Sequence, residues 1–449
     1  MQFQITADFI AKIEQLIAQK DGNALRELLQ EFHFADIAEL LEELGSDDAT
    51  YIIKLLESEL TSEALMELDD DVREKILDRL SPSEIAQELE ELDTDDAADI
   101  IAELDEDIQK EVIRKIEDEE HAADIVELLN YDEDTAGALM AKELVQVKET
   151  WTVAGCVREM RRQAENVTRV HSIYVTNKEG KLTGRLSLKD LLTAGEKTKI
   201  SEVFIPKVDY VTVHTDNEEV ARIMQKYDLE AIPVVDEDGI LVGRITIDDI
   251  VDFIKDEAEK DYQLAAGISQ DVEADDSVWE LTRARLPWLV LGLFGGLGSV
   301  YIMQGFEEAL ERFPILFFFT PLIAAMAGNV GVQSSAIIVQ GLANDNVKGS
   351  LFNRLIKEVG LALINGTALG LLVIGFGFIV GQDQLVSITI AISMLSVIIV
   401  AALVGTFVPI ILDRRGVDPA IATGPFITTS NDIFGIFLFF YISKVVLGF

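Results

Sequence analysis

The chain has 449 residues, with 80 acidic and 37 basic side chains and a formal net charge of −43. Half of the residues are apolar and a quarter are charged, so charge and hydrophobicity must lie in different regions. Residues 1–140 carry a net charge of −32, residues 141–284 one of −10 and the last 165 residues one of −1. This division excludes a single soluble globule. An acidic surface also repels phosphate, which argues against nucleic acid as a partner.

Residues 1–135 are predicted to form an acidic, all-α domain. Apolar residues recur there at i, i+3, i+4 and i+7 in short segments. A related phrase begins at Ala35, Ser83, Ala98 and Ala123. We therefore expect short helices that stack into a superhelix.

Runs of aspartate in this domain, which include Asp95 and Asp99, have two interpretations. They can be solvated faces of helices, which is the usual case for a charge run. Alternatively, because so much negative charge next to a second acidic module is costly, they can bind divalent cations. The second interpretation predicts a switch, in which cations close the acidic bodies together and their loss lets the bodies separate.

Residues 136–252 contain a pattern that is repeated at a constant offset of 59 residues. Each copy is predicted to be a strand, a glycine turn, a second strand and a helix capped by Ser187 or Thr246. A further strand and helix precede each copy. We expect a tandem α/β module with one repeat at about 138–200 and the other at about 201–252.

Residues 253–284 are predicted to connect this module to the apolar part of the chain. The acidic excess continues along the helix that leaves the second repeat, through Asp249, Asp252, Glu257 and Asp261. These side chains extend the surface on which a divalent cation would relieve repulsion.

Residues 285–449 are predicted to form an all-α membrane domain. Five apolar segments each approach or exceed the roughly 20 residues that cross a bilayer. They are residues 286–304, 313–342, 356–380, 385–412 and 424–447. Basic residues in the connections favour the side that carries the N-terminal half, which predicts a cytoplasmic N-terminus and an external C-terminus.

Polar residues inside these segments are candidate functional residues, because each costs energy there without a partner or water. Asp432 lies in the fifth segment, eight residues beyond Gly424 and so about 12 Å into it. It suits a cation pathway, or else a protonated packing contact. The second segment carries Pro321 and a Gly-Asn-Val-Gly-Val-Gln stretch with Asn329 and Gln333. This stretch either interrupts the helix beside a cavity or packs helices through small residues.

The residue types available near Asp432 favour a hard cation. Carboxylate, amide and hydroxyl oxygens suit Mg²⁺, which keeps several waters and needs only one or two carboxylates. One Asp in each chain suggests that two subunits share a pore. An enzyme is not predicted, since the sequence has no Walker loop, phosphorylation motif or nucleophile–base pair.

The middle module resembles a pair of CBS domains, and the whole chain resembles the MgtE family of magnesium channels. The most specific stretches are residues 328–333 and those from Asp418 to Asp432. The resemblance implies a homodimeric, multi-pass channel of the bacterial inner membrane that imports Mg²⁺ down its electrochemical gradient. Asp432 matches the pore carboxylate that receives hydrated Mg²⁺ with its dimer mate, and Asn329 and Gln333 are expected to line the pore.

The resemblance also implies that intracellular Mg²⁺ bridges the acidic domain, the CBS pair and the connecting "plug" helix, which holds the pore shut. The matching regulatory positions are Asp249, Asp252, Glu257, Asp261 and Asp418, with Asp95 and Asp99 as N-terminal partners. Lys260 departs from the family pattern, because it stands where members can carry an acid. One regulatory site is therefore in doubt.

In CBS domains a Gly-x-x-[Ser/Thr]-x-x-Asp stretch can hold an adenine nucleotide such as ATP. The two copies here supply Ser187 with Asp190, and Thr246 with Asp249. The same residues can equally be plain helix caps. Two other functions stay open: a Na⁺-coupled Mg²⁺ exchanger, and a membrane-tethered sensor of Mg²⁺ or nucleotide that does not transport.

Overall fold

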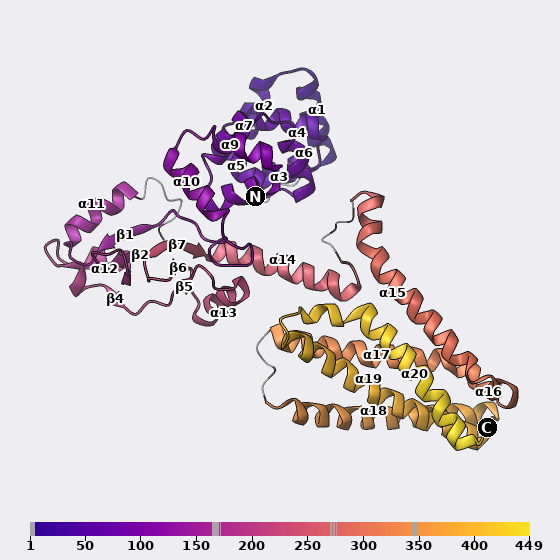
Figure 1. The fold of residues 1–449 in the computed structure, drawn as a ribbon. Helices are drawn as coiled ribbons and strands as arrows, with labels where there is room; N and C mark the ends of the chain where they lie inside the picture. The colour runs from indigo at the N-terminus through magenta and orange to yellow at the C-terminus, as the bar shows by residue number, and fades with distance from the viewer. Residues whose placement is uncertain are drawn as a thin grey trace. The chain divides into compact units, whose positions relative to one another are not determined.

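The computed structural model describes residues 5–163, 170, 172–269, 272, 274, 276–343, 347 and 349–449. It divides into two compact units, Met1–Ile254 and Lys255–Phe449. The first unit contains the helical domain and the tandem repeat, and the second contains the long apolar helices (Figure 1).

In the described part of the first unit, ten short helices precede the first strand, as the apolar periodicity predicts. They are α1 (Ala7–Ala18), α2 (Gly22–Leu29), α3 (Phe34–Glu42), α4 (Ser46–Ile53), α5 (Ser58–Met66), α6 (Asp70–Leu77), α7 (Pro82–Leu89), α8 (Thr94–Glu103), α9 (Glu106–Ile113) and α10 (Glu119–Leu128). Fully buried Ile37, Leu65 and Ile101 belong to one continuous core. Each helix is too short to be stable alone, so this shared core stabilises all of them.

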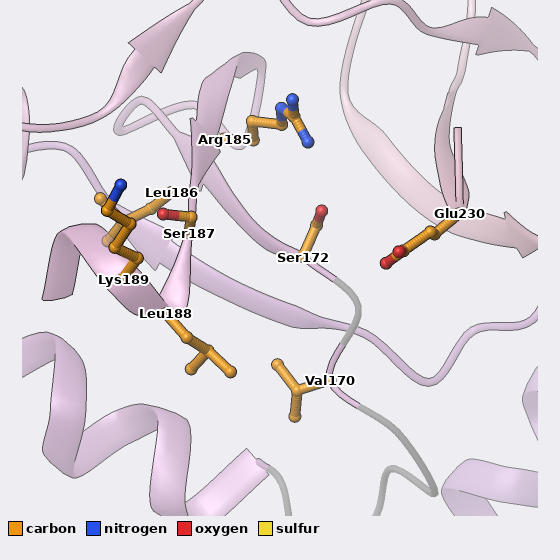
Figure 2. Close-up of a pocket in the computed structure, with 8 residues that line it drawn as sticks. All are labelled: Val170, Ser172, Arg185, Leu186, Ser187, Leu188, Lys189 and Glu230. Carbon is orange, nitrogen blue, oxygen red and sulfur yellow. The ribbon is translucent and has the colours of Figure 1, made fainter. Parts of the chain in front are cut away.

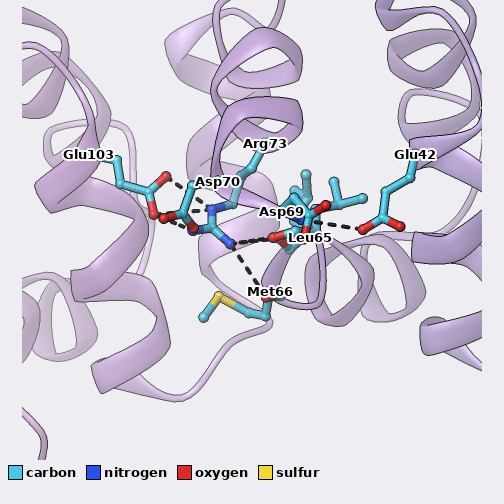
Figure 3. A network of polar contacts seen from close by, with 8 residues as sticks. Glu42, Leu65, Met66, Asp69, Asp70, Arg73 and Glu103 are labelled. Carbon is cyan, nitrogen blue, oxygen red and sulfur yellow. Dashed lines mark hydrogen bonds and ion pairs between the residues drawn. The ribbon is translucent and has the colours of Figure 1, made fainter. Parts of the chain in front are cut away.

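A buried arginine links three of these helices (Figure 3). Arg73 of α6 donates from Nε to both carboxylate oxygens of Glu103 at the end of α8, over 3.1 and 3.0 Å. Its Nη1 donates to the carbonyl oxygens of Met66 and Leu68, at and just beyond the end of α5, over 3.4 and 3.0 Å. The guanidinium therefore satisfies carbonyls that the end of a helix leaves unpaired, and its charge is balanced by Glu103.

The tandem repeat has the predicted order of elements in both copies. The first contains β1 (Val145–Lys148), α11 (Val153–Gln163), β2 (Ile173–Thr176), β3 (Leu182–Leu186), α12 (Leu188–Thr193), a 3₁₀ turn η2 (Ile200–Glu202) and β4 (Ile205–Pro206). The second contains β5 (Val211–Thr212), α13 (Asn217–Tyr227), β6 (Ala231–Val235), β7 (Leu241–Thr246) and α14 (Ile247–Ala266). In each copy the first strand runs parallel to the second, which pairs with the third in antiparallel fashion.

The two repeats join through their glycine turns. Gly180 and Gly239 both have positive φ, which favours glycine. The N–H of Leu182 donates to the Gly239 carbonyl over 3.1 Å, and that of Leu241 donates to the Gly180 carbonyl over 3.2 Å. The repeats differ at their ends: α12 has six residues, whereas α14 continues for 20.

The second unit contains five helices long and apolar enough to cross a membrane, in the described part of the chain. They are α15 (Val278–Gln304), α17 (Ile315–Ala343), α18 (Leu351–Val380), α19 (Gln384–Asp413) and α20 (Gly424–Leu447), with the short α16 (Glu307–Arg312) and the 3₁₀ turn η3 (Pro419–Ala422) between them. Two helices begin earlier than hydropathy predicts, because Ser277 and Ser350 cap α15 and α18 before their apolar runs begin.

The helix α17 is continuous through Pro321 and both glycines of its polar stretch, so the first of the two interpretations, an interrupted helix, is wrong. The glycines serve helix packing instead. A Cβ at Gly331 would overlap the side-chain amide of Asn431 in α20, and one at Gly405 of α19 would overlap the Gly331 carbonyl. Glycine at these positions therefore allows α17 to approach both neighbouring helices closely.

Candidate ion pathway and metal centres

A pocket of about 410 Å³ lies beside Asp432 in the second unit. Its lining comes from two helices: Ala324, Ala325, Gly328, Asn329, Val332 and Gln333 of α17, with Thr428 and Asp432 of α20. Asp432 is half-buried, whereas Asn329 and Gln333 are exposed. The structure thus brings the three predicted membrane-domain residues to one hollow.

Gly328 sets the distance between the two helices at this pocket. A Cβ there would lie 3.2 Å from Thr428 Cγ2 and 4.0 Å from Asp432 Oδ1. The polar groups of the lining are one carboxylate, two amides and one hydroxyl. Water occupies about 30 Å³ per molecule in the liquid, so the hollow has room for a cation that keeps a shell of water. This is an arrangement that Mg²⁺ accepts and that dehydrated Ca²⁺ does not prefer.

A second oxygen-rich site lies in the first unit, where α8 begins. Carboxylate oxygens of Asp93, Asp95 and Glu143 all lie within 4.8 Å of one another. Asp95 is buried, and within the described residues its Oδ1 has no hydrogen-bond partner. Glu143 accepts from the N–H and the hydroxyl of Thr94, over 3.2 and 2.8 Å. The donor set and the unpaired buried oxygen both fit a hard divalent cation.

The second repeat adds negative charge to this acidic cluster. Burial raises the pKa of Asp93 to about 6, with a further contribution from Glu143, and that of Asp96 to about 8, with a further contribution from Asp249. Burial, followed by repulsion from Asp96 and Asp249, also raises the pKa of Asp95 well above its ordinary value. These shifts indicate carboxylates that are crowded and under-neutralised.

One cation partly offsets this repulsion. Arg244 of β7 is 5 % exposed, and its Nη2 lies 3.1 Å from Asp93 Oδ2. Sequence reasoning identified Asp95 and Asp249 but missed Asp93, Glu143 and Arg244. Asp93 could have been found as the cap of the helix that contains Asp95. Glu143 and Arg244 lie far from it along the chain, and no spacing links them to α8. The predicted Asp99 is exposed and is not among the three residues of the cluster.

The two nucleotide-type motifs have different surroundings. In the first repeat, the Ser187 hydroxyl accepts from the Asp190 N–H over 3.1 Å and donates to the Asp190 carboxylate over 2.6 Å. Ser187 lines a pocket of about 590 Å³ (Figure 2). Arg185 and Lys189 line it from the same repeat, and Glu230 reaches it from the second. Asp190 is not part of this lining.

In the second repeat the corresponding residues lie against the helical domain. Asp249 accepts from the N–H and the hydroxyl of Thr246, over 2.8 and 2.7 Å, and Thr246 is 6 % exposed. Arg244, next to Gly243, pairs with Asp93 of the helical domain over 3.1 Å, and the charge of Asp249 helps to raise the pKa of Asp95. Asp249 therefore contributes to the acidic cluster around Asp95.

Two further carboxylates, those of Asp261 and Asp418, lie in the second unit, where the end of α14 meets the start of α20. A Cβ at Gly424 would overlap the carbonyl oxygen of Ala265, so the two chain segments touch. Burial raises the pKa of Asp261 to about 6, with a further contribution from the charge of Asp418. Asp418 itself accepts from the Ala420 N–H over 2.7 Å. Asp418 precedes Gly424, the first residue of α20, by six residues, and Asp432 lies on that same helix.

The other predicted residues of α14 are less enclosed. The Glu257 carboxylate lies 3.1 Å from Lys260 Nζ, so the lysine neutralises it in part. Asp252 is exposed. Lys260, the residue that departs from the family pattern, is thus placed to weaken Glu257 as a metal ligand.

Three family models match consecutive parts of the chain. The intracellular N domain of MgtE matches residues 32–134, CBS domains match residues 136–197 and 200–256, and the divalent cation transporter domain of MgtE matches residues 320–442. Together they define the class of the protein: a membrane protein of the divalent-cation-transporter type with a helical intracellular domain and paired CBS domains.

Full-length relatives narrow this class. The chain is 34 % identical over 440 residues to the magnesium transporter MgtE of Thermus thermophilus, and the alignment covers 97 % of this chain and 98 % of the relative. It is 36 % identical over 317 residues to the magnesium transporter MgtE of Bacillus subtilis, with 70 % of each chain covered. A crystal structure of the cytosolic domain of the Mg²⁺ channel MgtE in complex with ATP aligns with a TM-score of 0.52 at 37 % identity, over 54 % of this chain and 99 % of that one. The chain belongs to the MgtE family of magnesium transporters, a family of transporters and not of enzymes.

Proposed function

We propose that this protein is a channel that imports Mg²⁺ down its electrochemical gradient past Asp432. The observation that carries the proposal is the hollow between α17 and α20, where one carboxylate faces amides and a hydroxyl in a space large enough for a hydrated ion. A single carboxylate attracts a divalent cation without stripping its waters, and weak binding of this kind lets the ion leave again. The names of the full-length relatives support Mg²⁺ as the ion.

The proposed channel is a homodimer in the bacterial inner membrane, with its N-terminus in the cytoplasm. Each chain supplies one Asp432, and two such carboxylates across a shared axis would supply the pair with which Mg²⁺ is commonly held. Asn329 and Gln333 then act as outer contacts to the water shell of the ion, since both line the same hollow.

Intracellular Mg²⁺ is proposed to close this channel by binding the acidic sites. Asp95 and Asp249 are central ligands or neighbours of the ion, because Asp95 belongs to the three-carboxylate cluster and the charge of Asp249 acts on both Asp95 and Asp96. Asp261 and Asp418 form a second regulatory site beside the start of α20. Asp99, Asp252 and Glu257 are peripheral, because Asp99 lies outside the three-carboxylate cluster, Asp252 is exposed and Glu257 is paired with Lys260. A bound divalent cation relieves the repulsion and so favours the closed arrangement.

An adenine nucleotide is proposed to bind the first CBS repeat. The pocket near Ser187 offers a hydroxyl with the cationic side chains Arg185 and Lys189, which suits phosphate. The similar cytosolic domain was solved with ATP. Asp190 positions Ser187 through their hydrogen bonds. Thr246 and Asp249, by contrast, are proposed to serve the acidic cluster, because they pack against the helical domain.

Mg²⁺ flux into liposomes that contain the purified protein tests the proposal. Wild-type protein should admit Mg²⁺ at a rate that does not depend on Na⁺, and Asp432→Asn should reduce that rate to the background of empty liposomes. Glu307→Gln is the matched control, since it also removes one carboxylate but lies on the exposed α16. Strict dependence on Na⁺ would favour an exchanger. Unchanged flux in Asp432→Asn would contradict the proposed pathway, and no flux in wild type would favour a sensor.

A further inference from the structure

An acidic side chain, Glu358, lies just inside the apolar run of α18 and is not part of the Asp432 pocket. Glu358 is seven residues beyond the start of α18, about 10 Å along that helix. Its Oε1 accepts a hydrogen bond from the Ser334 hydroxyl of α17 over 2.6 Å. Ionisable residues inside membrane helices are costly and commonly have a function, so this pair requires an explanation.

The Glu358 side chain of α18 reaches α17, although α18 packs little against α17. Both α17 and α18 pack mainly against α19. Ser334 is 6 % exposed and lies beside Gly405 of α19, where a Cβ would be 3.1 Å from the Ser334 Cβ. The absence of a side chain at Gly405 therefore leaves room for Ser334, and the glutamate extends from α18 to meet it.

The hydrogen bond differs in kind from the neighbouring contacts of α17. Gly405 lies against the Gly331 carbonyl, and Gly331 and Gly328 lie against the side chains of Asn431 and Thr428. Contacts of small residues permit close approach and depend on shape alone. A hydrogen bond between two side chains is directional, so it fixes the rotation of α17 about its axis.

That rotation decides which groups face the ion. Ser334 directly follows Gln333, and Asn329 lies about one turn earlier on the face that lines the pocket. Successive residues of a helix are about 100° apart, so a modest turn would carry both amides away from Asp432. Ser334 is thus placed to keep Asn329 and Gln333 of α17 facing the pocket.

We propose that Glu358 is a positioning residue for the ion pathway, which acts by holding Ser334 and thereby orienting Asn329 and Gln333 toward Asp432. The proposal rests on the proposed function only for its effect on transport. Its structural part, the rotation of α17, can be measured separately.

Single-channel recording tests the effect on conduction. Glu358→Ala and Ser334→Ala should each lower the Mg²⁺ conductance by about tenfold, as expected for the loss of a hydrogen bond to a charged group. The double variant should be no worse than either one, since both remove the same bond. Glu358→Gln should keep most of the conductance, because its amide oxygen can accept the same hydrogen bond. Ser396→Ala is the control, since that hydroxyl bonds only back to Ile392 of its own helix, over 2.9 Å.

Crosslinking tests the rotation without any reference to transport. Asn329→Cys and Thr428→Cys, in a Cys156→Ala background, place two thiols on the pocket lining. A short bifunctional maleimide should join them in the parent and in Glu358→Gln, and severalfold less in Glu358→Ala and Ser334→Ala. Parent-like conductance and crosslinking in Glu358→Ala would overturn the inference. The inference would also be overturned if Glu358→Gln lost as much conductance as Glu358→Ala. That result would show that the negative charge of Glu358, and not its hydrogen bond, is needed. If wild type conducts no Mg²⁺ but the crosslinking follows this pattern, the proposed function fails and the positioning role stands.

Discussion

The two main carboxylate sites of the molecule differ in how many negative groups they collect. Around Asp95, three carboxylates lie within 4.8 Å of one another, and Asp249 adds further repulsion. Around Asp432, one carboxylate faces a hollow of about 410 Å³ that is otherwise lined by neutral side chains. Many carboxylates bind a divalent cation tightly and directly, whereas one carboxylate attracts the ion and releases it. The difference matches the two proposed roles, because a gate must retain its ligand and a pathway must not.

A second carboxylate in the Asp432 pocket should make it bind a divalent cation more strongly, as the acidic cluster around Asp95 is proposed to do. Thr428→Asp places that group one turn from Asp432 on the pocket face of α20. We expect Mg²⁺ conductance to fall by about a hundredfold, because a more strongly bound ion leaves more slowly, and we expect block by Ca²⁺ to increase. Thr428→Asn is the control of equal size without charge. Faster conduction in the aspartate variant would show that the site is limited by attraction of the ion and not by its release.

Removing charge from the cluster should weaken closure while conduction stays intact. The double variant Asp95→Asn, Asp249→Asn should need about tenfold more intracellular Mg²⁺ to close, because two carboxylates that favour the bound ion are lost. Inside-out patches with stepped Mg²⁺ provide the measurement. Glu111→Gln, on an exposed face of α9, should close as wild type does. Closure at the wild-type concentration in the double variant would separate the cluster from gating.

The raised pKa values predict a dependence of the metal-free protein on pH. Free carboxylates titrate near pH 4, whereas the pKa is raised to about 6 for Asp93 and about 8 for Asp96 in the packed state. Protonation therefore favours packing: this stabilisation is complete below about pH 4 and is lost progressively as the pH rises through the raised pKa values of about 6 and about 8. Cleavage by a protease near residues 130–145 should increase severalfold from pH 5.5 to pH 8 without metal, and little with millimolar Mg²⁺.

Asp96→Asn controls for the pH dependence of the protease itself in that experiment. Without the raised pKa of Asp96, the difference between pH 5.5 and pH 8 should shrink in the metal-free protein. A profile identical to that of wild type would mean that the carboxylates of the cluster do not control the packing.

A smaller effect is expected at the α14 site, where Lys260 neutralises Glu257. Lys260→Gln should free the carboxylate for metal and lower the Mg²⁺ concentration that closes the channel by about two- to threefold, as an exposed ion pair is worth little. Lys255→Gln is the control, because it removes the same charge from an exposed position of the same helix. For both variants, the dependence of channel closure on intracellular Mg²⁺ is measured in inside-out patches. A shift to higher Mg²⁺ would mean that Lys260 stabilises the closed state.

Local patterns in the sequence predicted most of the fold. The repeated pattern predicted the paired strands and helices of both repeats, since turns and caps are encoded by neighbouring residues, but it did not predict η2 or β4. Hydropathy predicted the five long helices but placed the starts of α15 and α18 too late, because Ser277 and Ser350 cap polar turns outside the apolar runs. The sequence left two interpretations open for the polar stretch of α17, and the structure favours helix packing: α17 is continuous, and Asn431 and Gly405 both pack closely against Gly331.

The functional sites were harder to predict from the sequence than the fold, because they depend on contacts between segments that are distant along the chain. Asp432 was identified by the cost of a carboxylate in an apolar helix, which needs no knowledge of its neighbours. Glu143 and Arg244 were not identified, since only the folded chain brings them to Asp93. The two nucleotide-type motifs appear equivalent in sequence, yet the second is packed against the helical domain.

Recordings of single channels in planar bilayers most directly test the central claim, that one carboxylate conducts and a separate cluster gates. Asp432→Glu, which keeps the charge but moves it by one methylene, should change the conductance and leave the Mg²⁺ dependence of closure as in wild type. Asp95→Asn with Asp249→Asn should change that dependence and leave the conductance unchanged. A variant at Asp432 that alters only gating, or a cluster variant that alters the conductance, would contradict the account.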